Sequence, residues 1–153
     1  MSTATLSLER SFDAPRDAVF AAWTDPEVLR RWWAAGPDWD TPEAEVDLRV
    51  GGSYRLAMRD PASGDVHVVG GEYTEVEPPE RLVYTWAWED AMSPGSDNSL
   101  VTVLFRDDGA RTTVLLTHTG FAGADEVGKH EHGWHAVMDS LERRVLTAGA
   151  ASS

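Results

Sequence analysis

The period of the hydrophobic pattern changes along this chain, and this change limits the folds open to it more than any other feature. Between residues 43 and 119 apolar and polar residues alternate, and turn signals such as Gly51-Gly52 and Asp108-Gly109 separate the alternating runs. Because short turns join neighbouring strands in antiparallel order, this stretch predicts an antiparallel meander. After Gly120 apolar residues recur three or four positions apart to about Ala148, which predicts one long C-terminal helix.

The segments before this meander predict one further strand and two short helices. Asp13 is expected to cap the first helix ahead of Pro15, and Thr24 is expected to cap the second, with Pro26 in its first turn. Residues 34–41 predict a loop because of their glycine and the neighbouring prolines. The expected strands are Thr3–Phe12, Glu45–Val50, Ser53–Arg59, Val66–Val76, Arg81–Trp88, Leu100–Arg106 and Arg111–Thr119.

The order of these elements predicts an α+β fold. A curved antiparallel sheet of six to seven strands is expected to carry two short helices and to hold the long helix across its concave face. On that helix one stripe, which contains His130, Trp134, Met138, Leu141 and Val145, is expected to face the sheet. A sheet that wraps around a single helix seldom closes tightly at both ends. The pattern therefore predicts an internal chamber.

Composition excludes several classes of function. The absence of cysteine excludes disulfide scaffolds, thiol catalysis and zinc-thiolate sites. The 13 Lys and Arg against 26 Asp and Glu give a net charge of -13, which would repel phosphate backbones and anionic lipids, so neither nucleic acid nor a membrane is expected as a partner. The sequence has no apolar run of the roughly 20 residues that a membrane span needs and no signal-peptide pattern, so a cytoplasmic location is expected.

Several local motifs add a family resemblance to this pattern. They are Phe12-Asp13-Ala14-Pro15, Arg31-Trp32-Trp33, Val50-Gly51-Gly52-Ser53-Tyr54-Arg55, Pro78-Pro79-Glu80-Arg81-Leu82-Val83-Tyr84-Thr85-Trp86 and Leu116-Thr117-His118-Thr119-Gly120-Phe121. In this order they resemble the family of activator of heat-shock protein 90 ATPase homologues, within the START-like (SRPBCC, polyketide cyclase-like) superfamily. The resemblance implies a helix-grip fold and a single START-like domain over residues 1–153, with its core at about 6–147 and a tail at 149–153.

The resemblance leaves several functions open, because one fold supports many of them. The leading expectation is that the chamber binds a small hydrophobic, aromatic or polyketide-like ligand without a cofactor. One alternative is a cyclase or dehydratase that uses the same chamber, although no catalytic residue is assigned and enzymatic activity stays open. The other alternative is a chaperone ATPase co-regulator or another protein-interaction module. A homodimer also stays open.

Candidate ligand-binding residues come from the inward-facing strand positions and from the apolar stripe of the last helix. They are Trp33, Tyr54, Leu56, Met58, Trp86, Trp88, Val103, Leu116, His118, Trp134, Met138 and Leu141. The competing interpretation is that these residues form only a hydrophobic core, with side chains such as Trp86 and Met138 filling the chamber.

Histidines are the residues that best suit proton transfer or metal binding in this chain. His118 is expected to point inward, where it could orient a ligand, move a proton or act as a hydrogen-bonded core residue. His130, His132 and His135 suggest a metal site, but only the last two share a helix face and no third ligand is identifiable. No metal is therefore expected, and the sequence has no Gly-x-Ser-x-Gly motif for a catalytic serine.

Overall fold

A seven-stranded antiparallel sheet and three helices make up the described part of the computed structural model, which covers residues 4–34, 38–88, 99–121 and 124–145. The strands are β1 (Ala4–Phe12), β2 (Asp40–Val46), β3 (Ser53–Arg59), β4 (Val66–Glu77), β5 (Arg81–Trp88), β6 (Ser99–Asp108) and β7 (Arg111–Phe121). The helices are α1 (Arg16–Thr24), α2 (Pro26–Trp32) and α3 (Ala124–Arg144). This architecture confirms the predicted α+β helix-grip fold.

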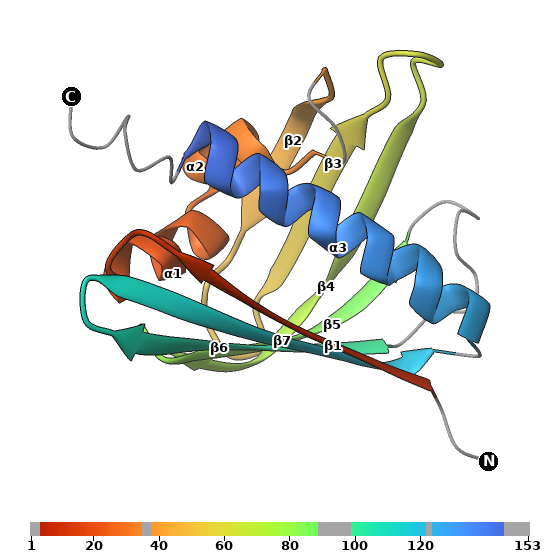
Figure 1. The fold of residues 1–153 in the computed structure, drawn as a ribbon. Coiled ribbons are helices and arrows are strands. Elements are labelled where there is room, and N and C mark those ends of the chain that lie inside the picture. The colour runs from red at the N-terminus through yellow and green to blue at the C-terminus, as the bar shows by residue number, and fades with distance from the viewer. Residues whose placement is uncertain (1–3, 35–37, 89–98, 122–123, 146–153) are drawn as a thin grey trace.

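The sheet has the strand order β1-β7-β6-β5-β4-β3-β2, with every neighbouring pair antiparallel. It bends between β4 and β5, where the pairing register shifts between Tyr73 and Glu75. Figure 1 shows the result: β1, β6 and β7 run across the bottom, whereas β2, β3 and β4 rise behind α3. Gly71 lies at this bend, and a Cβ atom there would lie 2.1 Å from the carbonyl oxygen of Thr85, so only glycine fits.

Helix α3 crosses the face of the sheet on which the short helices also lie (Figure 1). Four members of its predicted stripe, His130, Trp134, Met138 and Leu141, are buried as the helical spacing predicts. The fifth, Val145, lies just past the end of α3 at Arg144 and is partly buried. Two ion pairs join it to β1, from the Arg10 guanidinium to Asp139 at 2.6 Å and to Glu142 at 2.7 Å. Apolar burial and these ion pairs together hold α3 over the sheet.

The predicted caps of both short helices are wrong by one or two residues. Pro15 is the N-cap of α1, and no side chain caps it. Asp25, rather than Thr24, caps α2, because its carboxylate accepts the backbone N–H of Glu27. The Thr24 hydroxyl instead donates to the Phe20 carbonyl at the end of α1. Pro26 occupies the first turn of α2 as predicted.

Strand β2 is the largest departure from the predicted boundaries. The sequence predicts a strand at Glu45–Val50 after a loop, but the strand is Asp40–Val46 and contains Pro42. Proline is tolerated there because β2 is an edge strand, so the N–H that Pro42 lacks is not needed by a second neighbour. An ion pair between Asp40 and Arg59, at 2.9 Å, accompanies the pairing of β2 with β3.

Candidate functional site

An enclosed space lies between the bent sheet and the helices. Its lining comes from α1, α2, β3, β4 and β5 and consists of Trp23, Leu29, Trp33, Tyr54, Leu56, Tyr73, Tyr84 and Trp86. Its free volume is about 10 Å³. That is room for about one water molecule, so this space is far smaller than the ligand-sized chamber that the sequence predicts.

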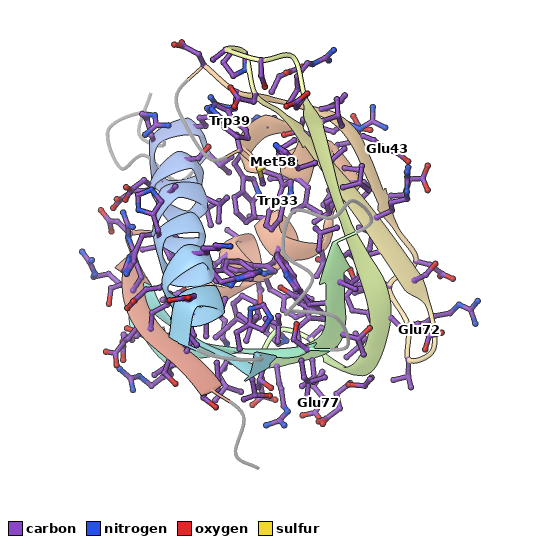
Figure 2. All side chains as sticks on the ribbon, turned by 90° about the vertical axis from the view of Figure 1, so that its right-hand side faces the viewer. Trp33, Trp39, Glu43, Met58, Glu72 and Glu77 are labelled. Atoms are coloured by element: carbon purple, nitrogen blue, oxygen red, sulfur yellow. The ribbon has the colours of Figure 1, made fainter. Side chains whose placement is uncertain are left out.

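Strand alternation and helical spacing explain how these side chains meet. Tyr54 and Leu56 are two residues apart on β3, and Tyr84 and Trp86 are two apart on β5, so each pair faces the same side of the sheet. Trp23 lies on the buried face of α1, and Trp33 is the residue that ends α2. In Figure 2, Trp33 and Met58 lie between α3 and the strands, whereas Glu43, Glu72 and Glu77 lie on the outer side of the molecule.

Tryptophans fill most of the volume around this space. Trp33 packs edge-on against Trp86 and Trp134, with both pairs of ring centroids 5.9 Å apart. Trp86 and Trp134 are themselves 5.0 Å apart, and Trp23 stacks on Trp134 at 6.5 Å. Because each indole occupies a large volume, this cluster leaves little free space.

The three tyrosines of the chain form a second aromatic cluster on the β-sheet side of the space. The ring centroids of Tyr54, Tyr73 and Tyr84 are 5.1 to 5.9 Å apart. The Tyr54 hydroxyl donates to the Thr85 carbonyl at 2.6 Å, and the Tyr84 oxygen accepts the Trp23 indole N–H at 3.2 Å. Burial raises the pKa of all three phenols, so the lining is uncharged at neutral pH.

His118 lies behind Trp86 in a fully buried hydrogen-bond chain. The Trp134 indole N–H donates to its Nδ1 at 3.2 Å, and its Nε2 lies 2.8 Å from the Ser99 Oγ. An indole nitrogen can only donate, so Nδ1 must carry the lone pair and the ring hydrogen must sit on Nε2. The Ser99 hydroxyl in turn donates to the Trp86 carbonyl at 3.0 Å. This chain fixes a neutral imidazole.

Electrostatics agree with this assignment. Burial, with a smaller contribution from neighbouring His130, lowers the pKa of His118 to about 3. The centroids of the two imidazole rings are 5.3 Å apart. A neutral ring whose two nitrogens are both bonded is poorly placed to exchange a proton with a substrate, so the geometry favours a packing role for His118 over general base catalysis.

The other histidines of α3 point in different directions. His130 is buried against His118 and Trp86, whereas His132 and His135 are exposed. Across the described residues, no three His, Cys, Asp or Glu side chains are close enough together to hold a metal ion.

The predicted ligand-binding residues fall into three groups. Trp33, Tyr54, Leu56 and Trp86 line the space, and His118 and Trp134 pack against Trp86 behind it. A third group is buried in the surrounding core without lining the space: Met58, Val103, Leu116, Met138 and Leu141. The side chain of Trp88 lies outside the described part of the structure.

Four lining residues are absent from the predicted set: Trp23, Leu29, Tyr73 and Tyr84. Alternation already places Tyr84 on the same inward face as Trp86, and helical spacing could have placed Trp23 in the lining. Tyr73 lies beside the register shift of β4, where alternation along the strand does not predict which side chains face inward. Nothing in the local pattern of α2 indicates that Leu29 reaches the same space.

A second hollow of about 410 Å³ lies at the bend of the sheet, lined by Glu45, Ser53, Tyr54, Arg55, Gly70, Gly71 and Ala87. Glu45, Arg55, Gly70 and Ala87 are successive partners across β2 to β5, and the lack of large side chains at the last two leaves the hollow open. Arg55 is ion-paired with Glu43. In contrast to the enclosed space, this hollow has a polar, charged rim.

Comparison with known proteins identifies a family that matches most of this chain. Residues 13–145 match the model of a family described as activator of Hsp90 ATPase homolog 1-like protein. Across the described residues, no helix is both long and apolar enough to cross a membrane. Among curated proteins, none matches the chain significantly.

Several solved structures share the fold. The AHSA1-like protein of Aeromonas hydrophila is 29% identical, with a TM-score of 0.80 over 95% of this chain and 94% of that chain. A protein from Chromobacterium violaceum is 30% identical, with a TM-score of 0.78 over 91% and 94% of the two chains. An HSP90 activator from Plasmodium falciparum is 27% identical, with a TM-score of 0.70 over 91% and 94%.

Proposed function

Because this chain belongs to the family of activator of Hsp90 ATPase homolog 1-like proteins, we propose that it binds a small apolar or aromatic molecule inside its helix-grip fold. The observation that carries this proposal is the lining of the enclosed space. All eight of its side chains are aromatic or aliphatic, and they come from five elements that meet where the sheet bends around the helices. Such a lining suits an uncharged ligand that is recognised by shape and apolar contact.

Binding in this space requires the lining to move apart, because its free volume is about 10 Å³. Removing about 200 Å² of apolar ligand surface from water would contribute about 5 kcal/mol. The cost of separating the aromatic rings reduces this gain, so moderate affinity is expected. The expected ligands are flat molecules of one to three rings, which can slide between aromatic faces.

The test is a binding screen with uncharged aromatic hydrocarbons and ketones of one to three rings, followed by indole fluorescence and by unfolding in urea. A ligand at about a hundred times its dissociation constant should raise the free energy of unfolding by about 2.7 kcal/mol. Leu56→Phe, which narrows the space, should weaken binding. Leu104→Phe is the matched control, because Leu104 is exposed on β6.

Two results would contradict ligand binding at this site. One is a screen in which no probe stabilises the protein. The other is a folded Leu56→Phe variant that binds a probe as tightly as the parent does, which would move the site away from the enclosed space.

A second candidate function is stimulation of an Hsp90-type ATPase. It is favoured by the structural similarity to the Plasmodium falciparum HSP90 activator at 27% identity. The measurement is the turnover of a purified Hsp90-type ATPase with and without this chain. Stimulation that is unchanged in Leu56→Phe would support this role and separate it from ligand binding.

A further inference from the structure

Trp33 carries a buried polar atom that has no partner in the part of the fold that the structure describes. The side chain is 2% exposed and lines the enclosed space, and its Nε1 makes no hydrogen bond to any described residue. Two other indoles of the same cluster have paired N–H groups. Trp23 donates to the Tyr84 hydroxyl, and Trp134 donates to His118. All three indoles are buried, and Trp33 differs from Trp23 and Trp134 because its N–H group has no acceptor among the described residues.

An unpaired N–H group in an apolar interior destabilises a protein by roughly 1–3 kcal/mol relative to a paired one. Most buried polar groups in folded proteins are therefore bonded, and each exception needs an explanation. An indole nitrogen can only donate, so whatever completes this site must offer an acceptor atom.

The lining provides poor acceptors for Trp33. The Tyr84 oxygen already accepts from Trp23, and the Tyr54 oxygen, whose hydrogen is donated to the Thr85 carbonyl, accepts no hydrogen bond from Trp33. Among the described residues, no Asp, Glu, Lys, Arg or His lines the space. The missing acceptor can therefore come from a molecule that enters the space.

We propose that the ligand of this site is an uncharged aromatic or apolar molecule with one hydrogen-bond acceptor, such as the carbonyl oxygen of an aromatic ketone, and that Trp33 Nε1–H donates to this acceptor. This inference rests on the proposed function. It adds a polar requirement to a site that otherwise selects by shape. Apolar contact would supply the affinity, and the single donor would orient the ligand.

The acceptor must be uncharged, because the described lining residues cannot replace the hydration that an anion would lose on entering the space. A carboxylate loses its hydration on entry, and the described lining residues include no cation to offset that loss. The burial that raises the pKa of the three tyrosines disfavours any negative charge at the same place. Carboxylate analogues are therefore expected to be excluded.

Tyr84 is the competing donor. Its oxygen accepts from Trp23, but its own hydroxyl hydrogen has no acceptor among the described residues. A ligand carbonyl could receive this hydrogen instead. The experiment must therefore distinguish the two donors.

The experiment uses 1-indanone, which has a carbonyl acceptor, and indane, which has nearly the same shape without one. Dissociation constants are measured for the parent, Trp33→Phe, Tyr84→Phe and Trp39→Phe, with urea unfolding to establish that each variant folds. Trp33→Phe should weaken 1-indanone roughly tenfold and leave indane within about twofold. Trp39→Phe is the matched control, because Trp39 is only partly buried and does not line the space.

An infrared measurement on the unmodified protein gives a second readout that does not depend on any variant. The carbonyl band of bound 1-indanone should lie at lower frequency than in an alkane solvent, because a hydrogen bond weakens the C=O bond. In Trp33→Phe the band should return toward its alkane position. Indane-1-carboxylate should not bind.

The outcomes separate this inference from the function on which it rests. If neither indane nor 1-indanone binds the parent, both proposals fail. If both bind but the carbonyl band is unshifted, or Trp33→Phe weakens both equally, the lining is purely apolar and the acceptor requirement is overturned. A band shift that persists in Trp33→Phe and disappears in Tyr84→Phe assigns the donor to Tyr84 and also overturns the inference.

Discussion

Mild acid is expected to destabilise this protein through His118. The ring is fully buried, and its Nδ1 accepts the Trp134 indole N–H, so the imidazole must be neutral in the folded state. Protonation would place a hydrogen on Nδ1, so that two N–H groups would face each other and the hydrogen bond from Trp134 would break. In the unfolded chain the same ring is solvated and takes up a proton readily as the pH falls.

The size of the effect follows from the difference in pKa between the two states. The folded pKa is about 3 and the reference value is 6.5. Below pH 6.5 the unfolded state binds the proton and the folded state does not. The contribution of His118 to the free energy of unfolding is therefore complete above pH 6.5 and falls as the pH decreases toward 3. Each pKa unit corresponds to about 1.4 kcal/mol, so the loss between pH 7 and pH 5 is about 2 kcal/mol.

The assay is urea unfolding of the parent and of His118→Asn at pH 7, 6 and 5. The asparagine carbonyl can still accept from Trp134, but the side chain does not titrate. The variant loses the Ser99 contact and should be less stable at pH 7 by about 1–3 kcal/mol. Between pH 7 and pH 5, however, it should lose about 2 kcal/mol less than the parent does.

His132→Asn is the matched control, because His132 is exposed on α3 and should leave the parent's pH dependence intact. Equal losses of stability in the parent and in His118→Asn would refute the argument. That result would mean that His118 takes up a proton in the folded state, and proton transfer by this residue would then have to be reconsidered.

Four further substitutions test the packing and the ion pairs of the fold, each by urea unfolding. Ser140→Ala should stabilise the protein by about 1 kcal/mol, because the Ser140 hydroxyl is fully buried with no hydrogen-bond partner among the described residues. A loss of stability would show that the hydroxyl is paired. Gly71→Ala should destabilise the protein by about 2 kcal/mol or more, because the new Cβ would lie 2.1 Å from the Thr85 oxygen. Gly128→Ala should instead stabilise α3 by up to about 1 kcal/mol, because nothing lies within 4 Å of the new Cβ. Similar effects at both glycines would contradict the close approach at the bend. Arg10→Met should cost about 1 kcal/mol at low salt and less in about 1 M NaCl, because Arg10 pairs with the half-exposed carboxylates of Asp139 and Glu142; a salt-independent loss would point to packing instead.

Much of the fold could be predicted because its signals are local. Alternation places Tyr54, Leu56 and Met58 on one face of β3, and the structure buries all three. Helical spacing likewise identifies the buried stripe of α3, including Trp134 and Leu141. These patterns depend only on the geometry of the chain within one element, so they can be read without knowing what the element packs against.

The position of β2 and the shape of the interior could not be predicted in this way. Pro42 argues against a strand locally, and only the edge position in the sheet makes it acceptable. Tyr73 joins the lining beside a register shift, which depends on how β4 pairs with β5. Each outcome depends on a partner strand that is remote in sequence.

By itself the sequence determined the buried face of the clearly periodic elements, such as Tyr54 and Leu56 on β3 and Trp134 and Leu141 on α3. Only the tertiary structure decided how much room those residues leave, that His118 is locked neutral between Trp134 and Ser99, and that Trp33 has no hydrogen-bond partner among the described residues. The physical reason is the distance along the sequence between the residues that determine each property. Hydrophobic period is a property of neighbouring residues, whereas free volume and hydrogen-bond pairing depend on how side chains from five separate elements fit against one another.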